Sequence, residues 1–503
     1  MKLANPCFKK TIYLIIFKSF FAAFALLYLP IGLAPDEAQY WTWSQNLSFA
    51  YYSKPPWIAW QIYLGTALFS NTEWAIRSPS LVISAGITLS MYLLAKNLKL
   101  KATGRFASAL MMSVCPIGIL ASFAATTDAP LILCWTLSAA LFVRDLDEKN
   151  AKSLEKIALL IALGALCKWP IYALWLFILP YSWLYLDTKP YRLIKCLSLS
   201  LLGLLPSLYW NIENNWGTFR HVYSSVIAPA NNEGGNAIEF LASQMGTLSP
   251  IFYVLSLMAI FQRIKKIKNN SAAESFCLSL SLFFWLLCHS LSFFNKVQAN
   301  WAVCAYPTAI VLAAKLIEEK AQLKVLYRWG TVLSLVISCL ALSIPSLQEN
   351  NIAAIPYRIN PFRHSMGWKN FSKLIEKSDY DPRQHFLFAD TYQTCSILNF
   401  YGPKQKKAYF LNLSIRRQNQ FSYWPGMKEE QLGKTGFFIS FNNDPPSPKQ
   451  IDNKKSELMA YFSEVDYLGS HAIFYNNNEP VKFARIYRCI TYNGKLPKSS
   501  SLY

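Results

Sequence analysis

Charge is in short supply in this sequence. Only 15% of its 503 residues are Asp, Glu, Lys or Arg, and 53% are hydrophobic, whereas an average soluble domain is roughly 25% charged. The shortage is uneven. Residues 1–346 are apolar runs separated by short polar loops, and residues 347–503 have an ordinary globular composition. We therefore expect a membrane domain over 1–346 and a soluble domain over 347–503.

Several common sequence motifs are also missing. The chain has no phosphate loop, no dinucleotide fingerprint, no HExxH and no CxxC. Most of the eleven cysteines fall in apolar runs, where cysteine behaves as a small hydrophobe. Cys395 and Cys489 lie well inside the soluble part, and a disulfide between them is one alternative if that part is extracytoplasmic.

The net charge of +21 could suggest a nucleic-acid partner. However, most basic residues of the first part sit in short loops between apolar runs, as the positive-inside rule describes. No basic stretch is interleaved with aromatic residues on a soluble surface. We therefore expect membrane lipids, and no nucleic acid, as partners.

The apolar runs and the loop charges together favour eleven membrane spans. The first is read as an uncleaved span, residues 57–70 as an interfacial or re-entrant helix, and residues 157–186 as two spans joined by a turn at Lys168-Trp169-Pro170. This topology puts the loops 34–77, 125–128, 211–245 and 295–300 on the outer side with the C-terminal domain. Besides the two within 157–186, the expected spans, the first included, are 11–33, 78–95, 106–124, 129–143, 196–211, 246–261, 274–294, 301–317 and 329–346.

The first outer loop carries two features suited to chemistry. Asp36 and Glu37 follow the first span directly, and a carboxylate there could take a proton from an acceptor hydroxyl. Pro35-Asp36-Glu37 also suits the first turn of a helix, where acids favour the dipole. Lys54 precedes Pro55-Pro56 and suits a phosphate, although a solvated loop lysine is the alternative.

Other outer segments add further charged candidates. Asp128, in TTDAP, is an acid in an apolar context and thus a functional candidate, or a helix cap. Lys168 is expected at the tip of a helical hairpin between aromatic residues. Arg220 and His221 follow an Asn- and Trp-rich loop and could hold an anion or contact lipid headgroups.

These segments together resemble the polyprenyl-phosphate-dependent glycosyltransferases of the dolichyl-phosphate-mannose protein mannosyltransferase type, whose bacterial branch includes aminoarabinose transferases that modify lipid A. The resemblance covers most of the membrane domain and is carried by motifs in order. They are PDEAQYWTWSQNLSFAYYSKPP (35–56), TTDAPLILCW (126–135), LGALCKWP (163–170), PSLYWNIENNWGTFRH (206–221) and VQANWAVCAYP (297–307). One departure is Gln39, because the aminoarabinose branch usually has an arginine shortly after its Asp-Glu pair.

The resemblance implies roles for individual residues. Asp36 would be the catalytic carboxylate, with Glu37 and Asp128 as further acids of the site. Lys54 would bind the carrier phosphate. Tyr52, Lys168, Arg220 and His221 would contact the carrier phosphate or sugar. No metal-ligand spacing is present and no cofactor is obligatory, but paired outer acids leave a divalent cation open.

The implied fold is a polytopic α-helical membrane protein of the GT-C type, with interfacial helices in the first outer loop. The C-terminal domain is expected to be α/β or α+β. Residues 367–377 and 392–398 are its helix candidates, and its strand candidates are 385–390, 406–411, 436–441 and 471–476.

The expected function is an inverting transfer of a sugar from a polyprenyl-phosphate carrier to an envelope acceptor, on the outer face of a bacterial inner membrane with the C-terminal domain in the periplasm. The acceptor could be lipid A or lipopolysaccharide, another glycan or a protein. A lipid-linked sugar transporter would explain the spans but not the large outer domain, and no inverted repeat supports it. A non-catalytic assembly subunit would make the outer motifs a docking surface.

Overall fold

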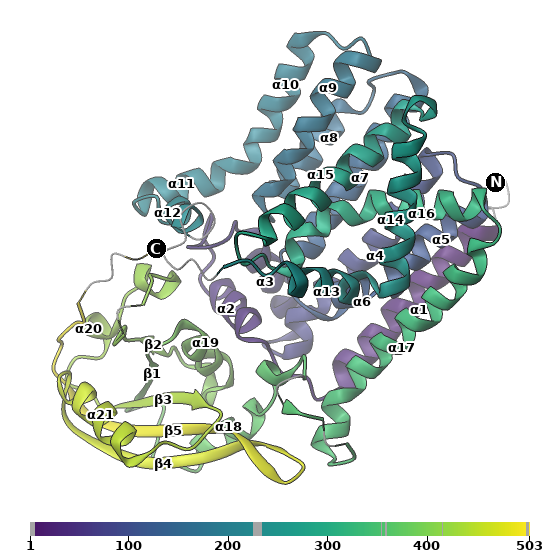
Figure 1. Ribbon diagram of the computed structural model, residues 1–503. Coiled ribbons are helices and arrows are strands. Elements are labelled where there is room, and N and C mark those ends of the chain that lie inside the picture. The colour runs from purple at the N-terminus through teal and green to yellow at the C-terminus, as the bar shows by residue number, and fades with distance from the viewer. Residues whose placement is uncertain are drawn as a thin grey trace.

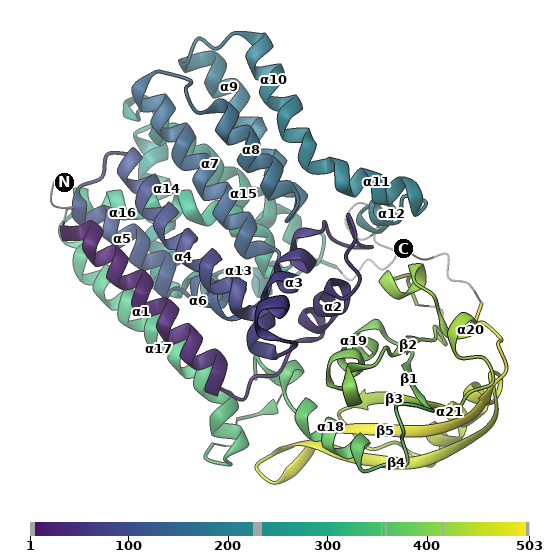
Figure 2. The ribbon, with the colours of Figure 1, turned by 180° about the vertical axis from the view of Figure 1, so that it is seen from behind.

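The computed structural model describes residues 6–224, 234–353, 355–357, 360–414, 416–498 and 502. A helical bundle forms the first part, and a small domain built on a sheet packs against one end of it (Figures 1 and 2). The main helices of the bundle are α1 (Pro6–Tyr28), α4 (Glu73–Asn97), α5 (Ala102–Val114), α6 (Pro116–Phe123), α7 (Asp128–Glu148), α8 (Leu154–Ala165), α9 (Trp175–Tyr185), α10 (Pro190–Leu201), α11 (Leu205–Glu213), α13 (Ala237–Leu248), α14 (Pro250–Lys265), α15 (Ala272–Ser292), α16 (Tyr306–Glu319) and α17 (Leu323–Glu349).

Fewer helices qualify as candidate spans by length and composition than the eleven expected from sequence. Within the described residues, seven helices are long and apolar enough to cross a membrane, or nine if the bent pairs α5–α6 and α13–α14 each count as one. The two other expected spans coincide with α8, of 12 residues, and with the 3-10 turn Trp169–Leu174 followed by α9, of 11 residues. Each helix is shorter than the roughly 20 residues that a span needs. The expected turn at Lys168 is present between them.

Two short helices lie between α1 and α4, in the segment predicted to be the first outer loop. These are α2 (Pro35–Ser44), of 10 residues, and α3 (Trp57–Phe69), of 13 residues. Both are too short to span a bilayer. A third short helix, α12 (Gly217–Val222), follows α11 after a turn in which Asn215 and Trp216 have positive φ.

The C-terminal domain contains a mixed sheet of five strands in the order β2-β1-β3-β5-β4. β1 is parallel to β2 and β3, and β5 is antiparallel to β3 and β4. All four expected strands are confirmed, but β5 was not expected. The strands are β1 (Phe386–Ala389), β2 (Tyr409–Phe410), β3 (Gly436–Asn442), β4 (Phe462–Asn476) and β5 (Glu479–Tyr492), and the helices are α18 (Trp368–Glu376), α19 (Tyr392–Tyr401), α20 (Met427–Glu430) and α21 (Pro448–Met459).

The two parts of the chain share a hydrophobic core. Buried side chains of α2 and α3 join those of α18, α19 and one face of the sheet in a single cluster. Trp41 of α2 packs edge-on against Phe400 of α19, with ring centroids 5.0 Å apart. Cys395 lies in this cluster, whereas Cys489 lies in the cluster on the other face of the sheet, and both thiols are unbridged. The disulfide considered from sequence is therefore not formed.

Candidate active site

A tight turn presents Lys54. Tyr51 and Lys54 form an isolated antiparallel bridge, with the Tyr51 N–H donating to the Lys54 carbonyl at 3.0 Å. The Tyr51 ring stacks on Trp43 of α2, with centroids 4.6 Å apart and planes 6° apart. Thr218, at the start of α12, donates its hydroxyl to the Tyr51 carbonyl at 3.2 Å. Three separate segments thus fix the position of Lys54.

The Lys54 turn also contacts the hairpin that carries Lys168. Directly after Pro55-Pro56, the Trp57 N–H donates to the Leu166 carbonyl at 3.0 Å. Two residues later along that hairpin, the Lys168 ammonium pairs with Asp128 at 2.7 Å. The elements that carry Lys54, Asp128 and Lys168 are therefore held together by direct contacts.

Both carboxylate oxygens of Asp128 are bound by side chains. Lys168 donates to Oδ1, and the Asn300 amide donates to Oδ2 at 2.7 Å. The helix-cap alternative for Asp128 does not describe this geometry, because its side chain bridges two other segments. Asn300 lies in the motif VQANW, but its individual role could not be read from sequence.

Asp36 and Lys54 influence each other's protonation. The Asp36 side chain stays accessible to solvent, although protein atoms surround it. This crowding raises the pKa of the Asp36 carboxyl, and the charge of Lys54 opposes the shift. Burial, together with the charge of Lys168, lowers the pKa of Lys54, while Asp128 and Asp36 act in the opposite direction. The four charged side chains thus form one electrostatic group.

Tyr52 and His221 lie at the edge of this group. Their rings are 4.7 Å apart, and Tyr52 is buried. Burial, followed by the charges of Arg417 and Lys54, lowers the pKa of His221 to about 4. The imidazole is therefore neutral at neutral pH and can form hydrogen bonds but adds no positive charge. Arg220 is the preceding residue on α12 and is exposed.

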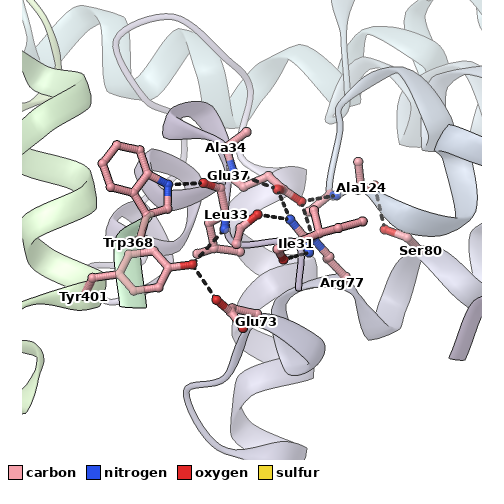
Figure 3. Close-up of polar contacts among 12 residues, drawn as sticks. Ile31, Leu33, Ala34, Glu37, Glu73, Arg77, Ser80, Ala124, Trp368 and Tyr401 are labelled. Carbon is pink, nitrogen blue, oxygen red and sulfur yellow. Dashed lines mark hydrogen bonds and ion pairs between the residues drawn. The ribbon is translucent and has the colours of Figure 1, made fainter. Parts of the chain in front are cut away.

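Glu37 has a different environment from Asp36 (Figure 3). The Arg77 guanidinium of α4 binds both of its oxygens, at 2.9 and 2.6 Å, and the backbone N–H groups of Ala34 and Ala125 donate to it at 3.1 Å each. Arg77 also donates to the carbonyls of Ile31 and Gly32. This buried pair ties the end of the α1–α2 connection to α4. All of these contacts of Glu37 are to groups of the protein itself.

The C-terminal domain also reaches the site. The Tyr52 N–H donates to the buried Gln420 side chain at 2.7 Å. Tyr392, the first residue of α19, is close enough to Asp36 for that charge to raise its pKa, after the larger effect of burial. Arg417 acts on both Asp36 and His221. Sequence reasoning missed Arg417 and Arg77, because nothing local marks a residue whose partner is far along the chain.

No metal-binding group is evident in the described part of the chain, where no three His, Cys, Asp or Glu side chains are placed to hold an ion.

Comparisons with known proteins agree with this arrangement. Residues 53–210 match the family model described as dolichyl-phosphate-mannose-protein mannosyltransferase. Over 296 residues, the chain is 31% identical to "Lipid A galacturonosyltransferase RgtD" of Rhizobium johnstonii, an alignment that covers 57% of this chain and 60% of that relative.

The fold has counterparts among solved structures. ArnT from Cupriavidus metallidurans bound to undecaprenyl phosphate superposes with a TM-score of 0.61, covering 96% of this chain and 98% of ArnT at 12% identity. The apo state of the same protein gives a TM-score of 0.60, 94% and 97% coverage, and 11% identity. Identity this low shows the fold alone. Together with the family-model match, it agrees with the resemblance inferred from the motifs: the chain is a multi-pass membrane protein with the GT-C fold, and its residues 53–210 are similar to the dolichyl-phosphate-mannose-protein mannosyltransferases.

Proposed function

We propose that this chain is an inverting glycosyltransferase that moves a sugar from a polyprenyl-phosphate carrier to an envelope acceptor. The reaction takes place at the outer face of a bacterial inner membrane, with the C-terminal domain in the periplasm. One observation carries the proposal: Asp36, Lys54, Asp128 and Lys168 come from four separate segments and act on one another electrostatically. That combination provides cations for a phosphate beside an accessible carboxylate.

The cations serve the leaving group. During transfer, the bond between the anomeric carbon and the phosphate oxygen breaks, and its electron pair stays on the carrier phosphate. Lys54 binds this phosphate as a point charge, and Lys168, held in place by its ion pair with Asp128, donates a further hydrogen bond to it. Fixed charges aimed at developing negative charge contribute strongly to catalysis. A bound phosphate stabilises the charged form of Lys54 most, because partial burial disfavours that charged form in the free protein and the negative charge of the phosphate offsets this effect.

Asp36 serves the acceptor. An acceptor hydroxyl attacks the anomeric carbon on the face opposite the phosphate, which inverts that centre, and its proton passes to Asp36. If the acceptor is a phosphate, the nucleophile is already anionic, and Asp36 orients the sugar instead. Glu37 acts as a positioning residue, since its ion pair with Arg77 fixes the first turn of α2 on which Asp36 lies.

The name of RgtD supports a lipid acceptor, and the ligand of ArnT supports a polyprenyl-phosphate carrier. RgtD is named as a lipid A galacturonosyltransferase, and ArnT has been solved with undecaprenyl phosphate. This chain spans about 60% of the length of RgtD. We propose lipid A or a related lipopolysaccharide as acceptor, and a polyprenyl-phosphate-linked sugar, with a uronic acid as the first candidate, as donor.

Mass spectrometry of envelope lipids and glycans tests the proposal. Cells would carry the wild-type chain, the Asp36→Asn chain, a matched Asp466→Asn chain or no chain. Asp466 is a suitable control because its ion pair with Arg488 is partly exposed on the sheet of the C-terminal domain. A sugar-sized mass increment with wild type and Asp466→Asn only would establish the transfer and its acceptor. No difference between wild type and the empty strain would favour transport or assembly, and full activity of Asp36→Asn would remove Asp36 from the mechanism.

A further inference from the structure

A segment of the C-terminal domain, which we call the arm (residues 416–424), crosses the loop that carries Lys54. Its Gln420 side chain accepts the Tyr52 N–H at 2.7 Å and is 1% exposed. Tyr423 packs its ring 5.9 Å from Tyr52 and 5.3 Å from Trp210 of α11. The arm is therefore fixed to the membrane domain at the candidate site.

The arm also packs closely against α12. A Cβ atom added at Gly217, the first residue of α12, would lie 2.5 Å from the Tyr423 hydroxyl. At the other end of this contact, Asn419 starts the 3-10 turn Gln420–Tyr423 by accepting the Phe421 N–H at 3.0 Å. The Tyr423 hydroxyl also donates to the side chain of Gln418 at 3.0 Å, which ties the residue directly after Arg417 to the packed part of the arm.

Arg417 lines a small surface cavity of about 150 Å³ together with its neighbour Arg416. The cavity is also lined by Tyr392 and Gln393 of α19 and by Asn419. The guanidinium interacts with the Tyr392 hydroxyl, a neutral group, so this contact does not cancel its charge. Arg417 is exposed to solvent, and its charge reaches both Asp36 and His221.

We propose that Arg417 and Tyr392 form a second anion-binding subsite beside Asp36, which holds an oxyanion of the substrates other than the carrier phosphate. The oxyanion is a carboxylate of the transferred sugar or a phosphate of the acceptor. This inference rests on the proposed function. The carrier phosphate already has Lys54 and Lys168, so a third cation at the reacting end has a separate anion to bind. A guanidinium with an adjacent hydroxyl suits either oxyanion, because both accept two donors side by side.

A simpler role would be neutralisation of Asp36. A counter-ion, however, forms a direct ion pair, and within the described residues the ion pairs of the chain do not include one between Arg417 and Asp36. The subsite also gives the C-terminal domain, which is fixed over the Lys54 loop, a part in substrate recognition.

Binding by the purified full-length chain tests the subsite without requiring turnover. Dissociation constants would be measured by native mass spectrometry for four probes: polyprenyl phosphate, polyprenyl-phosphate-linked uronic acid, bis-phosphorylated lipid A and the same lipid A after phosphatase treatment. The variants are Arg417→Gln, Arg417→Lys and Lys54→Gln. Arg383→Gln is the matched control, because Arg383 is an exposed arginine of the same domain that contacts Asp381.

We expect Arg417→Gln to weaken one charged probe roughly tenfold or more, the loss typical of a charge-assisted hydrogen bond. Weaker binding of the uronic-acid carrier, with polyprenyl phosphate unchanged, assigns the oxyanion to the sugar. Weaker binding of phosphorylated but not dephosphorylated lipid A assigns it to the acceptor. Arg417→Lys should restore part of the affinity, and Lys54→Gln should weaken both polyprenyl probes.

Unchanged affinity of Arg417→Gln for all four probes would overturn the subsite, as would equal weakening of every probe, which indicates a structural effect. The proposed function has a separate readout. If the wild type binds the charged probes in an Arg417-dependent way but transfers no sugar between them, the transferase proposal fails and the subsite stands.

Discussion

At the scale of single residues, the protein environment shifts the pKa values of Asp36 and Lys54 in opposite directions. The surrounding protein atoms raise the pKa of the Asp36 carboxyl, and burial lowers that of the Lys54 ammonium, so both charged forms are disfavoured in the free protein. The mechanism needs both charges. Activity is therefore lost as pH falls through the raised pKa of Asp36 and lost again as pH rises through the lowered pKa of Lys54.

We expect a bell-shaped profile of kcat/KM that is narrower than ordinary aspartate and lysine pKa values would give. The profile of kcat should extend further on the alkaline side, because the bound carrier phosphate stabilises the Lys54 ammonium in the complex. Steady-state transfer kinetics across the pH range, with a purified lipid-linked donor, would measure both limbs.

The variant Lys54→Arg distinguishes the acid limb of the kcat/KM profile from its alkaline limb. A guanidinium stays charged at any accessible pH, so this variant should lose the alkaline limb of kcat/KM while the acid limb stays in place. An alkaline limb that persists in Lys54→Arg would mean that another group titrates there.

Asp128 should act through Lys168 rather than on the substrate. Its two oxygens bind Lys168 and Asn300, so Asp128→Asn would leave Lys168 less well oriented towards the phosphate. We expect kcat/KM to fall roughly tenfold to a hundredfold, in the range seen for groups that position a catalytic partner. Asn300→Ala removes only the amide contact to Asp128 and should therefore lower kcat/KM less than Asp128→Asn does. A larger loss for Asn300→Ala would show that the amide touches substrate itself.

At the scale of elements, the Glu37–Arg77 pair joins α2 to α4. The side chains are 6% and 5% exposed, and breaking a buried pair leaves one charge uncompensated at a cost of about 3–5 kcal/mol. Glu37→Ala should therefore lower the melting temperature of the detergent-solubilised protein clearly. Lys99→Ala is the control, because Lys99 pairs with Asp147 while 72% exposed, and such pairs contribute about 0–1 kcal/mol. Similar melting temperatures for both variants would contradict a structural role for Glu37.

Elements with a local signature were predictable from sequence. The Lys168 turn follows from a lysine, a tryptophan and a proline in the middle of a long apolar stretch, and β1 and β3 follow from compact apolar and aromatic runs. β5 was missed because Lys482, Arg485 and Arg488 interrupt its pattern. Lys482 is nonetheless buried, with its ammonium 4.0 Å from the Trp368 ring centroid and bound to the Arg363 and Met366 carbonyls. Only tertiary partners explain that placement.

The same limit applies to the site. The outer-loop motifs pointed to Asp36, Lys54, Asp128 and Lys168, since charge is conspicuous in an apolar sequence. Arg417 is one of many charges in a soluble domain, and its proximity to Asp36 depends on how α19 docks on α2. No spacing along the chain encodes that contact.

At the scale of the whole molecule, the C-terminal domain is part of the membrane domain's fold rather than an appendage. The Tyr401 hydroxyl accepts the Leu33 N–H at 2.8 Å and donates to Glu73 at 2.6 Å, and the Trp368 indole donates to the Leu33 carbonyl at 3.0 Å (Figure 3). These bonds lie at the edge of the core that the two parts share. Separating the parts would expose that apolar surface.

Residues 350–503 produced alone should consequently lack a sharp cooperative unfolding transition and should bind a dye that reports exposed apolar surface. Co-expression with residues 1–349 should restore both properties, because the interface forms without the covalent link, and the two fragments should co-purify in detergent. A fragment that unfolds cooperatively by itself and does not associate with residues 1–349 would show that the C-terminal domain is an independent unit. In that case the arm could separate from the Lys54 loop, and the carrier would bind before the arm docks on that loop. Co-purification of inseparable fragments instead means that the carrier site and the arm over it are assembled together when the chain folds.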